Sequence, residues 1–169
     1  NPRLTIGRQM EEPLIVHGVP ERDRRRRTIA DAFASVGLSP DLLSRFPHEV
    51  SGGQRQRVLI ARALVLDPDF LVCDEPVSAL DVSVQAHVIN LLGELRREKN
   101  LSMLFISHDL RVVRHLCDRV AVMHRGGLVE IGAVDAVLEE PSHPYTRTLI
   151  ASVPSDRPRR SRRPEVVAS

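Results

Sequence analysis

The segment Ser51-Gly52-Gly53-Gln54 has the composition of an anion-binding helix start. The N–H groups of a first helical turn have no partner within the helix and carry a partial positive charge, so they attract anions. Two glycines let the backbone approach a phosphate because no Cβ stands in the way, and Ser51 and Gln54 add polar side chains. A serine-capped helix with a glycine turn explains the same residues without a ligand, so this segment alone is weak evidence.

Two neighbouring acids, Asp74 and Glu75, follow the apolar run 70–73. Such a run is typical of a strand buried on both faces, and α/β sheets bind their ligands at the carboxyl ends of strands. At this place we expect Asp74 to hold Mg²⁺, directly or through water, and Glu75 to polarise an attacking water as a general base. Two solvated acids in a turn are the alternative interpretation.

His108 follows a second apolar run, residues 103–106, and is a further candidate. Histidines at strand ends are often structural, so its position alone assigns no role.

The two cysteines, Cys73 and Cys117, lie far apart and show neither a C-x-x-C spacing nor a partnered histidine. We expect both to be buried, reduced thiols.

Strands and helices alternate after residue 51, which predicts an α/β fold with a largely parallel sheet. The predicted helices of this part are residues 55–66, 82–98, 110–117, 134–139 and 145–151, and the predicted strands are residues 70–73, 103–106, 120–123 and 128–131. Gly126-Gly127 marks a hairpin turn before the last strand. His143-Pro144-Tyr145 is typical of a helix start with a packed tyrosine.

The first 50 residues contain no strand-like run and are predicted to be helical. The predicted helices are residues 5–16, 20–36 and 40–46, followed by a loop at 47–49. Pro13 is expected to kink or end the first of them, because proline lacks an N–H and clashes with the preceding turn.

Composition limits the possible function classes. At 169 residues the chain is one domain or most of one, and 42% hydrophobic residues suffice for a packed core. Residues 154–169 hold five arginines and two acids, so the remaining 19 basic and 20 acidic residues leave a nearly neutral body. Aromatic residues make up only 3%, which argues against a nucleic-acid binder. No apolar run approaches the ~18 residues of a membrane span and no signal peptide opens the chain, so membrane association is expected to go through a partner.

Longer strings around these residues resemble motifs of the ATP-binding cassette (ABC) ATPases. SGGQRQRVLIARA at 51–63 resembles the family's signature motif and the helix after it, and FLVCDEP at 70–76 resembles its Walker B strand. SALD at 78–81 resembles the family's D-loop, and SHD at 107–109 resembles its switch region. The resemblance implies a P-loop NTPase-like ABC ATPase domain of the α/β class, with a helical subdomain and a largely parallel sheet.

The resemblance also implies two cofactors, ATP and Mg²⁺, and a role for each candidate residue. Glu75 and His108 are the implied catalytic residues and Asp74 is the implied metal ligand, all acting on ATP bound by their own subunit. The signature motif of this family meets ATP that a second subunit holds. The nucleotide-binding residues that the resemblance implies are Ser51, Gly52, Gly53, Gln54 and Asp81.

The family's phosphate loop has no counterpart in this sequence. No G-x-x-x-x-G-K-S/T string occurs, and the only lysine, Lys99, has no glycine near it. We therefore expect the second half of a nucleotide-binding domain, truncated at its N-terminus and inactive as an ATPase by itself. The predicted domains are a helical subdomain (1–50), a signature helix with the catalytic α/β core (51–133), a C-terminal extension (134–154) and a disordered basic tail (155–169).

Two segments indicate the branch of the family. NPRLTI at 1–6 resembles a stretch of the di- and oligopeptide importers, and EPSHPYTRTLIASVP at 140–154 resembles the C-terminal extension of those ATPases and of their nickel-importing relatives. The implied function is ATP hydrolysis that powers peptide import, from a peripheral position on the cytoplasmic face of the cell membrane. The implied partners are a second ABC ATPase subunit, transmembrane permease subunits and, indirectly, an extracytoplasmic solute-binding protein, with no nucleic acid.

Three alternatives stay open at this point. A nickel importer ATPase fits the same extension. A non-transport ABC ATPase acting on DNA or the ribosome predicts coiled-coil insertions or tandem cassettes, and this sequence has neither. A non-catalytic binding module that offers only its signature face has no need of Asp74, Glu75 and His108, so their presence argues against it.

Overall fold

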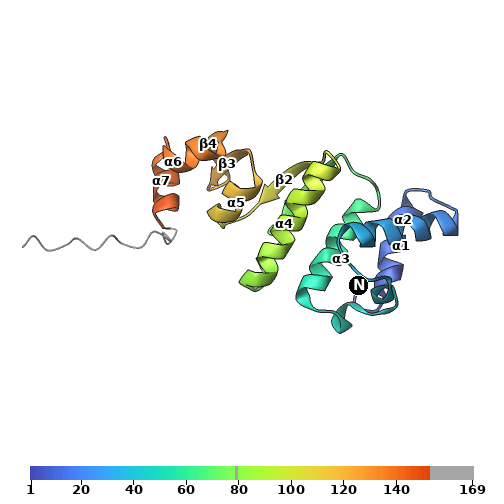
Figure 1. Cartoon of the computed structure of the whole chain (residues 1–169). Coiled ribbons are helices and arrows are strands. Elements are labelled where there is room, and N and C mark those ends of the chain that lie inside the picture. Colours follow the sequence, from blue (N-terminus) through green and yellow to red (C-terminus); the bar gives the residue numbers. More distant parts are fainter. Residues whose placement is uncertain (79, 153–169) are drawn as a thin grey trace, which may run out of the picture. The chain divides into compact units, whose positions relative to one another are not determined.

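The computed structural model describes residues 1–78 and 80–152, and the chain divides into two compact units. The first unit runs from Asn1 to Leu116, and the second begins at Cys117 (Figure 1). The predicted division into four domains stays a prediction, and its tail, residues 155–169, lies outside the described residues.

Helices make up the first part of the first unit. Their bounds are α1 Ile6–Val16, α2 Arg22–Ser35, the 3₁₀ turns η1 Pro40–Ser44 and η2 Pro47–Glu49, and α3 Gly52–Leu64. Apolar residues recur at helical spacing along α1 and α2, so each helix buries one stripe where the three α-helices contact one another. Ile6, Met10 and Phe33 are among the most deeply buried side chains there. The predicted helical character of this part is confirmed.

Prolines lie at two points of the predicted helices. Pro13 lies inside α1 without ending it, and the carbonyl of Gln9, which the proline deprives of its helical donor, accepts a hydrogen bond from Nε of Arg62 at 3.1 Å. The helix predicted before Pro47 is only the 3₁₀ turn η1, because Phe46 precedes the proline and is held extended. The loop predicted after it is the turn η2.

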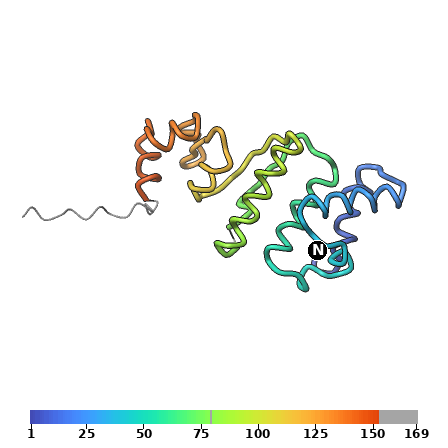
Figure 2. The backbone as a smooth tube through the Cα atoms, viewed as in Figure 1, coloured from blue at the N-terminus to red at the C-terminus, as the bar shows by residue number. Residues whose placement is uncertain are grey.

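The rest of the first unit is a parallel β-α-β arrangement followed by a helix, as predicted. Its elements, traced along the backbone in Figure 2, are β1 Phe70–Asp74, α4 Val82–Glu98, β2 Ser102–Ile106 and α5 Leu110–Leu116. The two strands pair in register from Phe70 with Ser102 to Asp74 with Ile106. Because the strands are parallel, both end at the same edge, which brings the residues after Asp74 beside those after Ile106.

The prediction that these strands are buried on both faces is wrong for the described residues. Phe70 and Val72 of β1 are each 56% exposed, and Leu104 and Ile106 of β2 are 50% and 45% exposed. Side chains alternate between the two faces of a strand, so these four lie on one face of the pair. A single crossover helix covers one face of a parallel pair, and Cys73, which points to the opposite face from these four, is buried.

The second unit contains the predicted hairpin and two short helices. Its elements are β3 Arg119–His124, β4 Gly127–Ala133, α6 Val134–Glu139 and α7 Pro144–Ala151. The strands pair antiparallel, and Arg125 and Gly126 turn the chain with φ values of 50° and 80°, the left-handed region that suits glycine. Across residues 1–78 and 80–152, no helix is long and apolar enough to cross a membrane.

Candidate functional site

The edge where β1 and β2 end brings Glu75 and His108 together. Nδ1 of His108 lies 3.2 Å from Oε1 of Glu75, within hydrogen-bonding distance. The two residues are 33 positions apart, and the strand register joins them: the N–H of Glu75 donates to the carbonyl of Ile106 at 3.0 Å, continuing the ladder one step beyond the strand. Both side chains are largely open to solvent, so a ligand at this edge has access to them.

Glu75 has an unusual backbone conformation. Its φ of 44° lies in the left-handed region, which a residue with a Cβ enters only at a cost of about 1–3 kcal/mol. The next residue, Pro76, disfavours the right-handed helical region for Glu75. Ser78 holds the turn, because its N–H and its hydroxyl both donate to the Glu75 carbonyl, at 3.3 and 3.1 Å. Backbone strain of this kind clusters at functional sites, and the Glu75 side chain here lies within hydrogen-bonding distance of His108.

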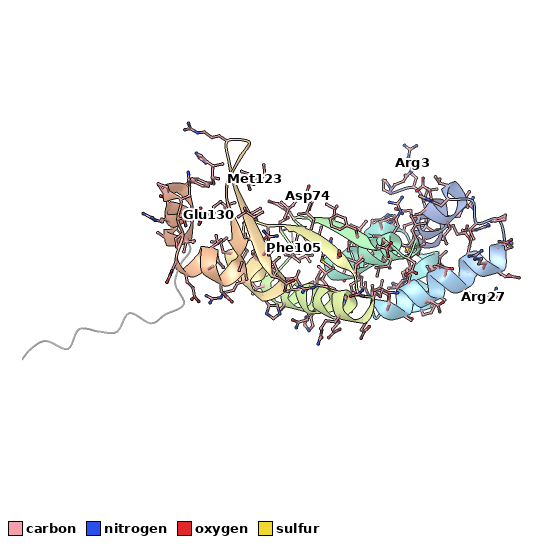
Figure 3. The ribbon with its side chains drawn as sticks, turned by 90° about the horizontal axis from the view of Figure 1, so that it is seen from above. Arg3, Arg27, Asp74, Phe105, Met123 and Glu130 are labelled. Atoms are coloured by element: carbon pink, nitrogen blue, oxygen red, sulfur yellow. The ribbon has the colours of Figure 1, made fainter. Side chains whose placement is uncertain are left out.

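Asp74 is the last residue of β1 and is exposed at the same edge (Figure 3). It is the register partner of Ile106, one position before Glu75. Two adjacent carboxylates at a strand end supply the hard oxygen ligands that Mg²⁺ prefers. Within residues 1–78 and 80–152, no group of three or more His, Cys, Asp and Glu side chains is close enough to hold a metal ion.

Asp109, next to His108, is tied to the start of α5. Its carboxylate accepts hydrogen bonds from the N–H of Arg111 at 2.9 Å and from the Arg111 guanidinium at 3.0 and 3.2 Å. The guanidinium is the main reason why the pKa of Asp109 lies below its usual range. Asp109 thus caps the start of α5 and anchors the loop that carries His108.

The segment Ser51–Gln54 forms a capping box at the start of α3. Oγ of Ser51 accepts from the N–H of Gln54 at 3.2 Å, and Oε1 of Gln54 accepts from the N–H of Ser51 at 3.0 Å. The predicted N-cap is confirmed. The N–H groups of Gly52 and Gly53, in the first helical turn, have no partner within the helix, so they are the groups that this turn can offer to an anion.

Asp81 is the N-cap of α4. Its Oδ1 accepts from the N–H of Val84 at 3.0 Å and from the hydroxyl of Ser83 at 2.8 Å. These donors, the Val84 N–H first, hold the pKa of Asp81 below its usual range. An aspartate before an apolar-periodic run is a capping signal, so the cap itself was visible in the sequence.

The candidate residues therefore form two groups in the first unit. Glu75 and His108 meet at the strand edge beside Asp74, whereas Ser51–Gln54 lies at the start of α3. Among the residues that the structure describes, no hydrogen bond or ion pair links this turn to Glu75 or His108. The two groups are not parts of a single hydrogen-bonded site.

Two parts of the chain match known families. Residues 1–78 match the family described as ABC transporter. Residues 1–78 are therefore part of an ABC transporter domain. Residues 129–168 match a second description, the C-terminal region of oligopeptide/dipeptide transporters.

The predicted fold, an α/β ABC ATPase domain, is confirmed by solved ABC cassettes. The dimeric structure of the bacterial ABC transporter cassette MJ0796 matches 79% of this chain and 58% of its own with a TM-score of 0.68 and 29% identity.

Another cassette, cbiO1 from Clostridium perfringens, matches 81% of this chain and 54% of its own with a TM-score of 0.71 and 28% identity. The oligopeptide transport ATP-binding protein OppF of Escherichia coli is 54% identical over 155 residues, which are 91% of this chain and 46% of OppF. The glutathione import ATP-binding protein GsiA of Pectobacterium atrosepticum is 52% identical over 167 residues, 99% of this chain and 27% of GsiA. The chain thus spans half or less of the length of these curated relatives.

One polar cluster of the second unit has no signal in the sequence. The carboxylate of Glu130 on β4 accepts from the N–H groups of Ser142 and His143, at 2.8 and 3.1 Å, and so fastens the start of α7 to the hairpin. The neighbouring Thr146 side chain is the largest cause, and the Ser142 N–H the next, that keeps the pKa of Glu130 below its usual range. No local sequence pattern predicts this role, because a single glutamate in a strand does not indicate which residues it will bond to.

The predicted helix start at His143 is confirmed. Nδ1 of His143 accepts from the N–H of Tyr145 at 3.1 Å, and Pro144 is the first residue of α7. The Tyr145 ring packs on the ring of His124, with centroids 3.8 Å apart. The segment typical of the oligopeptide/dipeptide branch is thus a capped helix held to the β3–β4 hairpin, whose Met123 and Glu130 are labelled in Figure 3.

Proposed function

We propose that the complete protein is the ATP-binding and ATP-hydrolysing subunit of a peptide importer. The hydrogen bond between Glu75 and His108 at the end of β1 is the observation that carries the proposal. It joins a carboxylate able to act as a general base to an imidazole, both open to solvent at the strand edge where α/β sheets bind ligands. The match of residues 129–168 to the oligopeptide/dipeptide transporters supports a peptide as the solute.

Each residue of the strand edge has a role in this proposal. Glu75 orients and polarises the water that attacks the γ-phosphate, and His108 holds the Glu75 carboxylate while its ring lies open to the nucleotide. Asp74 holds Mg²⁺, which needs only one or two carboxylates because it keeps water and phosphate oxygens as its other ligands. When bound, Mg²⁺ neutralises negative charge on the phosphates. The chain's own contribution is then to position the water and these charges.

The Ser51–Gln54 turn serves a second nucleotide in this proposal. Its open N–H groups at Gly52 and Gly53 suit the γ-phosphate of ATP that a second ABC subunit holds. The MJ0796 cassette, similar to this chain, forms a dimer. We propose that two cassettes also pair here, head to tail, on transmembrane permease subunits at the cytoplasmic face of the membrane, supplied by an extracytoplasmic solute-binding protein.

The phosphate loop of the ATP site belongs, in this proposal, to a part of the protein outside this chain. The only lysine, Lys99, pairs with Asp67 at 3.9 Å and lies in no glycine-rich loop. The exposed apolar face of β1 and β2 fits a sheet that the remainder of the protein completes. By itself the 169-residue chain is expected not to hydrolyse ATP.

The test is the ATPase rate of the complete protein with Glu75→Gln, which keeps the shape of the side chain and removes its basicity. The rate is expected to fall by about 10²–10⁴-fold, the contribution of a positioned general base. Glu98→Gln, an exposed glutamate at the end of α4, is the matched control and is expected to keep the wild-type rate. Equal rates for the two variants would refute the role of Glu75.

A different measurement distinguishes a peptide importer from a nickel importer. Uptake of a labelled oligopeptide and of ⁶³Ni²⁺ is compared in cells with and without the complete transporter. Peptide uptake that depends on Glu75 supports the proposal, and nickel uptake with no peptide uptake supports the alternative importer. The non-catalytic module is disfavoured by the Glu75–His108 hydrogen bond, which a module offering only its signature face does not require.

A further inference from the structure

The starts of α3 and α4 come into close contact at Gly53. A Cβ placed on Gly53 would lie 2.6 Å from Cγ1 of Val84 and 3.9 Å from Cβ and Cγ2 of the same residue. Two carbon atoms that are not bonded do not approach to 2.6 Å, since their best separation is about 3.5–4.0 Å. Valine in a helix has one strongly preferred side-chain rotamer, so Val84 does not swing aside easily. Gly53 therefore has no room for any side chain while Val84 stays in place.

The backbone conformation does not explain this glycine. The glycines with positive φ among the described residues are Gly18, Gly37 and Gly126, so Gly53 has a helical conformation open to any L-residue. The neighbouring Gly52 is less restricted, because a Cβ there would meet Cδ2 of Leu80 at 3.6 Å, an ordinary contact. The two glycines of one motif are thus under different constraints.

The position of Val84 is itself determined by Asp81. Asp81 caps α4 and accepts the N–H of Val84 at 3.0 Å, so the first turn of α4 is held where it meets α3. Val84 is only partly exposed, consistent with packing of its side chain on the α3 start. A continuous path of contacts thus leads from Asp81 through Val84 to Gly53.

We propose that Val84 is a positioning residue for the Ser51–Gln54 turn. Its side chain is the surface on which Gly53 packs, so the start of α4 determines where the open N–H groups of α3 lie. The consequence for nucleotide rests on the proposed function: displacement of this turn weakens its contact with the γ-phosphate held by the second subunit. The competing explanation is that Gly53 is required only for close approach of the nucleotide, in which case Val84 has no influence.

A compensating pair of substitutions in the complete protein distinguishes these explanations. Gly53→Ala introduces the clash and is expected to lower the unfolding midpoint and to reduce the ATPase rate by about 100-fold, the cost of an ångström-scale misplacement of a positioned group. Adding Val84→Ala removes Cγ1 and leaves the two Cβ atoms at the ordinary separation of 3.9 Å. The double variant is therefore expected to recover most of both losses.

The matched control pairs Gly53→Ala with Val82→Ala, which makes the same deletion two positions earlier in α4. Val82 is 84% exposed, so its truncation relieves no clash and is expected to restore neither quantity. If the Gly53→Ala/Val84→Ala variant is as unstable and as slow as Gly53→Ala alone, the proposal is overturned. Recovery of the unfolding midpoint without recovery of the rate also overturns it, since the contact would then be purely structural.

Two further measurements distinguish a positioning role of Val84 from a general loss of structure, and failure of this proposal from failure of the proposed function. In a Glu75→Gln background, Gly53→Ala is expected to reduce ATP-driven dimerisation while ATP binding to the monomer is retained, and Val84→Ala is expected to restore the dimer. Equal loss of binding and dimerisation would contradict a positioning role. If the wild-type protein hydrolyses no ATP, the proposed function fails, but the unfolding midpoints still test the contact between Gly53 and Val84.

Discussion

The Ser51–Gln54 turn and the strand edge that carries Glu75 and His108 are built in opposite ways. Two hydrogen bonds between Ser51 and Gln54, three positions apart, close the turn. The edge depends on two residues 33 positions apart that meet only because β1 and β2 pair in one register. A register slip of one residue would separate Glu75 from His108 and leave the turn intact. The turn is local structure, whereas the edge is a product of the tertiary fold.

The largest expected effect comes from breaking the edge without touching the turn. His108→Ala in the complete protein removes the partner of the Glu75 carboxylate, and the ATPase rate is expected to fall by about 100-fold, the lower range for a positioned acid–base group. The unfolding midpoint is expected to change little, because His108 is exposed. His115→Ala, an exposed histidine on α5, is the control, and the same rate for both variants would remove His108 from the site.

A second prediction concerns the sheet on which the edge depends. Val72→Thr replaces a methyl group with a hydroxyl on the open face of β1. If the rest of the complete protein covers this face, the buried hydroxyl is expected to lower the free energy of unfolding by about 1–3 kcal/mol. Val82→Thr makes the same change at a position that is 84% exposed and is expected to cost little. Chemical denaturation of both variants gives the difference, and equal values would mean that the face stays open.

The turn itself is tested by Ser51→Ala. Loss of the cap is expected to lower the free energy of unfolding of the complete protein by about 1 kcal/mol. Ser39 precedes η1 in the equivalent position but makes no capping hydrogen bond through its side chain, so Ser39→Ala is a matched control. A cost for Ser51→Ala no greater than that for Ser39→Ala would show that the capping box contributes nothing to stability.

The smallest expected effect concerns Glu130. Its hydrogen-bond partners, Ser142 and His143, are 12 and 13 positions away, a separation between that of the Ser51–Gln54 turn and that of the strand edge. Because its pKa is lowered in the folded state, its contribution to stability is present above the unfolded carboxyl pKa of about 4.3 and is lost as the pH falls through the folded value. Glu130→Gln is expected to reduce amide-exchange protection at Ser142 and His143 at neutral pH, and the difference from wild type is expected to vanish below that window. A difference that persists in acid would assign the effect to shape and not to charge.

The helices, the hairpin and the caps were predictable because their causes act over a few residues. Ser51, Asp109 and Pro144 are recognisable helix-start residues. Gly126 marks the hairpin, although Arg125 and Gly126 make its turn, one position before the predicted Gly126-Gly127. The burial of β1 was not predictable in the same way. An apolar run shows that a strand has two apolar faces, but whether both are covered depends on the elements packed against it, and Phe70 is 56% exposed here.

Capping, turn chemistry and hydrophobic periodicity are short-range effects, so the amino-acid sequence is enough to predict most helices and strands and the polar residues at their ends. The meeting of Glu75 with His108, and the lack of room for a side chain on Gly53 beside Val84, follow from the tertiary structure. The physical reason is the same in both cases. Each feature depends on the distance between two residues that lie far apart in the sequence. Strand register and helix contact set such a distance, whereas the conformational preferences of the single residues do not.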